Sequence, residues 1–120
     1  MAKLCLLNED GDVADHWDLS GRPVAVGRGG SVDIRIDDDG LSRRHFMIFR
    51  DGEDFVIKDL SSRNGTWVVG ARESTRTLRH NDFIRAGRSS FRFCEYGFPP
   101  RGMLKPGRGP HDTVVIAVGE

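Results

Sequence analysis

Short apolar runs separated by glycine, aspartate and asparagine turns recur at intervals of about 8–12 residues, and this limits the chain to few folds. Such spacing is typical of an antiparallel sandwich or barrel, and no window shows the apolar stripe of an amphipathic helix. We therefore expect an all-β antiparallel β-sandwich with little or no helix. The runs that we interpret as strands are 4–7, 24–26, 32–36, 46–48, 55–57, 67–69, 83–84 and 91–93.

The bulk composition excludes several classes of protein. The chain has 120 residues, enough for one domain with a hydrophobic core. Lysine plus arginine total 18, as do aspartate plus glutamate, and this neutrality argues against a general binder of nucleic acid or of membrane surfaces. The longest apolar run, 114–118, is far shorter than the roughly 20 residues that cross a bilayer, and the first residues have no signal-peptide pattern. We expect a cytoplasmic monomer with no nucleic-acid or membrane partner.

Two cysteines and a change in composition complete the outline of the chain. Cys5 and Cys94 lack metal-ligand spacing and fall in the first and last predicted core strands, so we favour two buried thiols over a disulfide. The segment 97–110 contains four prolines and four glycines, which is typical of a linker. We divide the chain into a domain over 1–96 and a Pro/Gly-rich linker with an extra strand or tail over 97–120.

Polar clusters lie where one apolar run ends and the next begins, and loops held by a scaffold are where binding residues concentrate. The clusters are Gly27-Arg28, Ser42-Arg43-Arg44-His45 and Ser61-Ser62-Arg63-Asn64-Gly65-Thr66. Arg28 and Arg43 supply guanidinium groups, and Ser42 supplies a short hydroxyl at the start of a strand. Asn64 offers an amide to a peptide main chain, and Gly65 permits the positive φ of a tight turn. These donors suit a phosphate group, which has three acceptor oxygens and a charge near −2.

In order and spacing, these clusters and the later Leu78, Asn81-Asp82 and Ile84 resemble the forkhead-associated (FHA) domain over residues 3–95. The resemblance implies a β-sandwich of about eleven strands that binds phosphothreonine peptides through loops at one end, with no enzymatic activity and no cofactor. It implies that the phosphopeptide-binding residues are Arg28, Ser42, Arg43, Arg63 and Asn64. It also implies that the loops are shaped by Gly27, His45, Gly65 and Thr66. Val69-Gly70 departs from the Asn-Gly pair frequent in the family, which places one turn in question.

Other functions would use some of the same residues. A hydrolase would need Ser42, His45 and Asp59 together, but the chain has no nucleophile elbow or oxyanion motif, and we interpret His45 as a buried brace of the binding loops. A phosphate-independent assembly domain of the same fold is the alternative that the sequence leaves open. A nucleic-acid binder would use Arg43, Arg44, Arg63, Arg72, Arg76 and Arg79.

Two further groups have a structural interpretation. Asp37-Asp38-Asp39 lacks the spaced oxygen ligands of a calcium loop, so we expect a solvated turn and no metal site. The aromatic residues are expected to fill the core, with Trp67 as a brace under the site. They are Phe46, Phe49, Phe55, Trp67, Phe83, Phe91 and Phe93.

Overall fold

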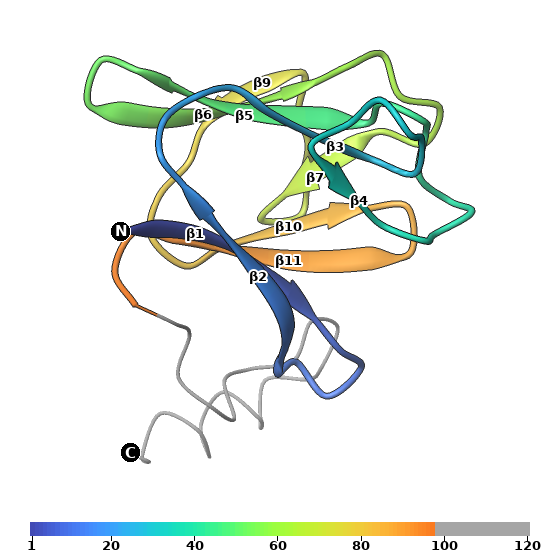
Figure 1. Ribbon diagram of the computed structural model, residues 1–120, viewed down its shortest axis with the longest axis horizontal. Helices are drawn as coiled ribbons and strands as arrows, with labels where there is room; N and C mark the ends of the chain where they lie inside the picture. The colour runs from blue at the N-terminus through green and yellow to red at the C-terminus, as the bar shows by residue number, and fades with distance from the viewer. Residues whose placement is uncertain (98–120) are drawn as a thin grey trace.

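Two β-sheets packed face to face form the domain (Figure 1). The computed structural model describes residues 1–97, and the regular structure of this part is entirely β, in eleven strands. The six-stranded sheet has the order β2-β1-β11-β10-β7-β8, and the five-stranded sheet has the order β4-β3-β5-β6-β9. The predicted all-β sandwich is confirmed. The described residues form no apolar helix of membrane-spanning length, and the predicted linker and tail lie, apart from Gly97, outside them.

The strands are short and follow one another closely along the chain. They are β1 (Ala2–Leu7), β2 (Val13–Leu19), β3 (Val24–Gly27), β4 (Ile34–Arg35), β5 (Phe46–Asp51), β6 (Asp54–Asp59), β7 (Thr66–Val68), β8 (Ala71–Arg72), β9 (Thr75–Thr77), β10 (Asp82–Ala86) and β11 (Ser89–Cys94). Each predicted strand has a counterpart among them, whereas β2, β8 and β9 were not predicted. These three are rich in exposed polar residues, so they show no apolar run.

The predicted strand over 32–36 is only two residues long in the structure. β4 pairs in parallel with β3 at the edge of its sheet, through Ile34 and Arg35. The Asp33 carboxylate accepts a hydrogen bond from the Ala25 N–H at 2.8 Å, and the Asp33 N–H donates to the Ala25 carbonyl at 3.0 Å. The Asp33 side chain thus accepts a hydrogen bond that a backbone carbonyl would accept if the strand were longer. Ile34 is buried all the same, as the alternation predicts.

Apolar residues on the inner faces of both sheets form one core. Phe46 of the five-stranded sheet meets Phe91 of the six-stranded sheet edge to face, with ring centroids 5.6 Å apart. Phe55 and Phe93 pack beside them, so four of the seven predicted aromatic residues are core residues. Trp67 is not, since 41% of it is exposed on the outside of β7. Phe49 and Phe83 are half-buried, and Trp17 of β2, which was not predicted, packs against the core instead.

The two cysteines lie on neighbouring strands. β1 and β11 are antiparallel, with Lys3 opposite Cys94 and Cys5 opposite Arg92. Both thiols are free and fully buried, as predicted. A hydrogen bond with Cys94, together with burial, raises the pKa of the Cys5 thiol. The same bond lowers the pKa of the Cys94 thiol, and burial keeps both sulfur atoms away from solvent.

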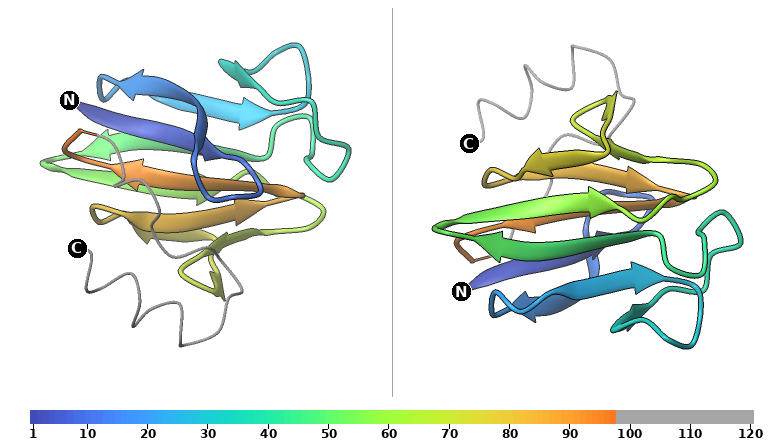
Figure 2. Two further views of the ribbon diagram at one scale, coloured as in Figure 1. Left: turned by 90° about the horizontal axis from the view of Figure 1, so that it is seen from below. Right: turned by 90° about the horizontal axis from the view of Figure 1, so that it is seen from above.

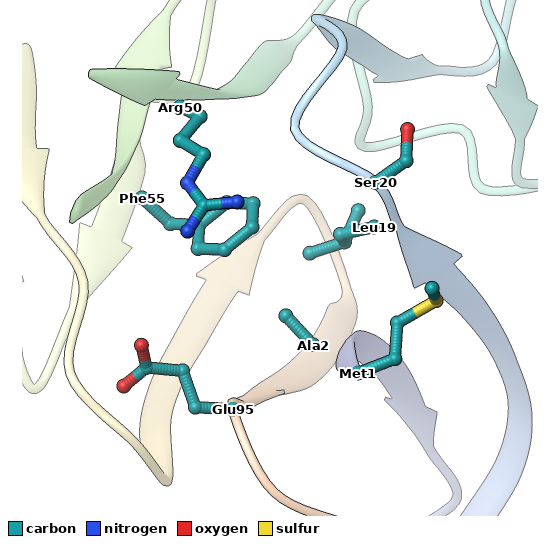
Figure 3. Close-up of a pocket in the computed structure, with 7 residues that line it drawn as sticks. All are labelled: Met1, Ala2, Leu19, Ser20, Arg50, Phe55 and Glu95. Carbon is teal, nitrogen blue, oxygen red and sulfur yellow. The ribbon is translucent and has the colours of Figure 1, made fainter. Parts of the chain in front are cut away.

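The two ends of the sandwich carry different parts of the chain. The start of β1 and the end of β11 lie at one end, at the left of Figure 1. The β3–β4, β4–β5, β6–β7 and β10–β11 connections lie at the other, and the two views of Figure 2 show these loops projecting from the same end of the sheets. A hollow at the first end holds Arg50, whose guanidinium carbon lies 5.5 Å from the centre of the Phe55 ring (Figure 3). None of the predicted site residues lines that hollow.

Candidate functional site

The β3–β4 and β4–β5 loops are bound to one another through their backbones. The Arg28 N–H donates to the Ser42 carbonyl at 3.1 Å, and the Arg28 Nε donates to the Leu41 carbonyl at 2.8 Å. A Cβ atom on Gly27 would lie only 2.1 Å from the carbonyl oxygen of Arg43. Gly27 therefore shapes the site by allowing a close approach of the two loops, which any larger residue would prevent.

Ser42 and His45 connect this pair of loops to the β6–β7 loop. Ser42 lies in the β4–β5 loop rather than at the start of a strand, because β5 begins at Phe46. Its Oγ accepts a hydrogen bond from the Arg63 N–H at 3.0 Å, which leaves the hydroxyl proton for a ligand. His45 is fully buried, and its Nδ1 accepts from the Ser42 N–H at 3.0 Å. Its Nε2 therefore carries the proton and donates to the Gly65 carbonyl at 2.8 Å.

These contacts make His45 a brace between two loops. Both ring nitrogens are bound to backbone groups, so the imidazole has no lone pair directed at the Ser42 hydroxyl. Asp59 does not orient the ring either, since its carboxylate accepts hydrogen bonds from Ser62 and Thr66. The three residues of the hydrolase alternative are thus close in space but are not arranged as a nucleophile, base and orienting acid.

Asn64 and Gly65 lie in the turn of the β6–β7 loop, where Asn64 is exposed and Gly65 is buried. Gly65 has a φ of +86°, as the sequence predicts. The Asn64 Nδ2 donates to the Gly40 carbonyl at 2.9 Å, so the amide is fixed while its oxygen remains an acceptor. Below the turn, Thr66 is buried and donates to Asp59 at 2.7 Å. Burial opposes ionisation of Asp59, but hydrogen bonds from Ser62 and Thr66 outweigh it and hold the pKa of the carboxyl below its ordinary value.

Asp38 is a loop brace that the sequence did not reveal. The expected solvated turn is wrong at this residue, because Asp38 is buried and accepts hydrogen bonds from the Gly40 N–H, the Arg88 N–H and the Ser89 hydroxyl. Burial alone would raise the pKa of its carboxyl, but these hydrogen bonds outweigh burial and hold the pKa below its ordinary value. Asp38 thereby joins the β4–β5 loop to the β10–β11 turn. Asp37 and Asp39 are exposed, as expected.

Three arginines belong to the loops that meet at Ser42. Arg28 is half-buried, whereas Arg43 and Arg63 are exposed. None of the three takes part in an ion pair within residues 1–97, unlike Lys3 with Asp18 and Arg76 with Glu73. Guanidinium groups, a hydroxyl and backbone N–H groups on these connected loops are the kinds of donor that a compact anion with more than one negative charge requires.

The other predicted functions find less support in the described part of the chain. Arg76 is paired with Glu73, and Arg79 precedes β10 at the end opposite the loops, so the arginines proposed for nucleic acid do not form one surface. No group of three or more histidine, cysteine or acidic residues within 1–97 is placed to hold a metal ion.

A family model for the FHA domain matches residues 24–87, which include the loop residues described above up to the β10–β11 turn. The chain belongs to the FHA-domain family. FHA domains are phosphothreonine-dependent binding modules. Among curated relatives, FhaA of Mycobacterium tuberculosis is 42% identical over 64 residues, which are 53% of this chain and 12% of FhaA. An oxoglutarate dehydrogenase inhibitor of Corynebacterium jeikeium is 34% identical over 70 residues, or 58% of this chain and 49% of the inhibitor. The chain therefore spans at most about half the length of these two relatives.

Solved FHA structures share the whole sandwich. A structure from a study of phosphothreonine-dependent FHA interactions is 32% identical, with a TM-score of 0.72 over 81% of this chain and 98% of that one. The FhaA FHA domain, complexed with the intracellular domain of Rv3910, is 33% identical, with a TM-score of 0.69 over 78% of this chain and 99% of that one. EmbR of Mycobacterium tuberculosis, in complex with a low-affinity phosphopeptide, is 31% identical, with a TM-score of 0.71 over 82% of this chain and 25% of that one.

Proposed function

We propose that this FHA domain binds a protein partner through a phosphothreonine, and that Arg28, Ser42 and Arg43 hold the phosphate. The observation that carries the proposal is the hydrogen bonding of Ser42, whose carbonyl accepts from the Arg28 N–H and whose hydroxyl accepts from the Arg63 N–H. Ser42 thus joins loops whose arginines have no carboxylate partner within residues 1–97. A phosphate has a charge near −2 and three acceptor oxygens, which matches this set of donors better than a single carboxylate does.

Each residue has a distinct part in the proposed complex. Arg28 presents its remaining N–H groups to the phosphate, since its Nε is already bound to Leu41. Ser42 donates its hydroxyl proton, and Arg43 and Arg63 add charge from exposed positions. Asn64 accepts a peptide N–H with the oxygen of its fixed amide. Gly27, His45, Gly65 and Thr66 hold the loops in this arrangement before the ligand arrives, which lowers the entropy cost of binding.

A titration by fluorescence anisotropy tests the proposal. Labelled phosphothreonine peptides with varied flanks are compared with their phosphoserine and unphosphorylated counterparts. We expect binding of the phosphothreonine peptides only, and no binding by Arg28→Ala. Each charged hydrogen bond contributes roughly 1.5–3 kcal/mol, so removing one lowers the affinity about tenfold or more. Binding of Arg28→Ala with the wild-type affinity refutes the role of Arg28.

Two further variants separate loss of contact from loss of loop structure. Arg28→Ala also removes the bond to Leu41, whereas the Arg43 guanidinium donates no hydrogen bond within the described part of the chain. Arg43→Gln therefore removes charge without loosening a loop, and we expect weaker phosphopeptide binding at an unchanged melting temperature. Arg79→Gln, at the opposite end, is the matched control. If wild-type protein binds no phosphopeptide, the phosphate-independent assembly function replaces this proposal.

The setting of the domain is part of the same proposal. We propose that residues 1–96 are the binding domain and act as a monomer in the cytoplasm, without nucleic acid or membrane as partner. The two free thiols support a reducing compartment, where cysteines stay unpaired. A sedimentation profile of a single species, unchanged by concentration, is the expected result.

A further inference from the structure

Arg72 lies against Gly65 of the β6–β7 loop, a position that no sequence pattern predicts. A Cβ atom on Gly65 would lie 2.4 Å from the Arg72 Nε and 2.8 Å from its Cζ, so the guanidinium occupies the space that the bare glycine leaves. Arg72 is exposed, and no hydrogen bond or ion pair of its side chain occurs within residues 1–97. The Arg72 guanidinium, whose N–H groups have no partner within residues 1–97, thus covers the turn at Asn64 and Gly65.

The strand register places Arg72 in a row with two other exposed side chains. Trp67 of β7 lies opposite Arg72 of β8 on one side and opposite Arg85 of β10 on the other. Directly opposed residues of antiparallel strands share one face, so the three side chains stand together on the outside of the six-stranded sheet. Trp67 is 41% exposed and Arg85 is exposed as well. We call Arg72, Trp67 and Arg85 the outer row.

The outer row is continuous with the loop that is proposed to hold the peptide. The Trp67 indole N–H donates to the Asn64 carbonyl at 3.3 Å, which fixes the ring against that loop. Neighbouring strands are about 4.8 Å apart, so Arg72 and Arg85 are separated by about 10 Å, the length of about three extended residues. Arg85 also lines a hollow that continues the surface across β11, with Arg88, Ser90 and the acidic Glu9 among its other lining residues.

We propose that the outer row binds an acidic stretch of the phosphorylated partner, within a few residues of the phosphothreonine. This inference rests on the proposed function. Two guanidinium groups without carboxylate partners in the described part of the chain favour acidic side chains, and the exposed indole offers apolar contact to their aliphatic parts or to the peptide backbone. The row is too short to neutralise the run of phosphates on which nucleic-acid affinity depends.

The test compares peptides that share one phosphothreonine core. One peptide has glutamine at the flanking positions, a second has glutamate before the phosphothreonine, and a third has glutamate after it. We expect wild-type protein to prefer one of the glutamate peptides by about fivefold to tenfold at low salt, since each exposed charge pair contributes up to about fivefold. The preference is expected to fall as salt is added, while binding of the glutamine peptide persists.

Variants assign the preference to the row. Arg72→Gln and Arg85→Gln are each expected to remove part of the preference, and the double variant all of it, without changing the affinity for the glutamine peptide. Arg79→Gln, an equal change of charge at the opposite end, is expected to leave the preference intact. In a Trp17→Phe background, Trp67 is the only remaining tryptophan, and its emission is expected to change with the preferred glutamate peptide and not with the glutamine peptide.

The outcomes separate this inference from the proposed function. Equal affinity of wild-type protein for all three peptides overturns the outer row and leaves phosphothreonine binding intact. An equal loss for all peptides in Arg72→Gln also overturns it, because Arg72 then acts on the phosphate. Binding of single-stranded DNA that is lost in Arg85→Gln would assign the row to nucleic acid instead. If no phosphopeptide binds, the proposed function fails. The outer row then fails as well, unless an unphosphorylated glutamate peptide binds and loses affinity in the double variant.

Discussion

Replacing Val69 by asparagine is expected to stabilise the domain. Val69 and Gly70 form the two-residue connection between β7 and β8, with φ angles of +49° and +82°. Two successive positive φ angles define the turn in which Asn-Gly is the preferred pair, and a β-branched residue there is strained. The sequence placed this turn in question, and the structure forms it with valine in the unfavourable conformation.

The magnitude follows from two opposing terms. A left-handed conformation costs a non-glycine residue about 1–2 kcal/mol, and asparagine tolerates it better than any other residue with a side chain. Val69 is 58% exposed, so its replacement sacrifices about 0.6 kcal/mol of apolar burial, if the lower end of the usual range is taken for a side chain as small as valine. The net gain in the free energy of unfolding is about 0.5–1 kcal/mol, which raises the melting temperature of a domain of this size by about 3–6 °C.

Thermal unfolding followed by circular dichroism measures this effect. Val69→Gly is the informative companion, since it also relieves the strain but increases the entropy of the unfolded chain. The Val69 N–H donates to the Phe83 carbonyl at 2.9 Å, and both replacements keep that bond. A melting temperature that stays constant or falls in both variants refutes the strain argument.

Three other predictions concern the loops and the thiols. His45→Ala removes both bonds that join Ser42 to Gly65, so we expect lower stability and weaker phosphopeptide binding, measured by thermal melts and anisotropy. The pKa values of Asp38 and Asp59 are depressed in the folded state, so their contribution to stability is present above about pH 4, the unfolded pKa, and is lost as pH falls through the folded values. Denaturant titrations at pH 5 and pH 3 should show this loss, and a smaller one in Asp59→Asn. Cys5 should resist iodoacetamide at pH 8 until the protein unfolds, because burial and its bond to Cys94 raise the pKa of the thiol. Rapid labelling of native protein, detected by mass spectrometry, would contradict that assignment.

Much of the sandwich follows from the sequence because its inner strands carry apolar runs. Phe46, Phe91 and Phe93 each mark a strand that is paired on both sides. β2 is an edge strand with polar outward residues, so its period-two pattern is hidden among His16, Asp18 and their neighbours. Edge position also explains why the run over 32–36 produces only a short β4.

The site was predictable where its residues are neighbours in the sequence, and less so where distant loops meet. His45 was assigned as a brace, and it does join Ser42 to Gly65. Asp38 was missed because its partners, Arg88 and Ser89, lie about fifty residues further along the chain. From the sequence, Arg72 is considered only as one of the arginines that a nucleic-acid binder would use. Its place over Gly65 depends on the β7–β8 register, which no local pattern encodes.

The pairing of Lys3 with Cys94 has a practical consequence for the use of this domain as a reagent. It places the start of β1 and the end of β11 side by side, at the end of the sandwich away from Arg28, Ser42 and Asn64 (Figure 1). A dye, a surface linker or a fused protein attached before β1 would therefore stand behind the binding loops and leave them facing the solution. Immobilised in that orientation, the domain would capture phosphopeptides on a sensor surface with its loops unobstructed.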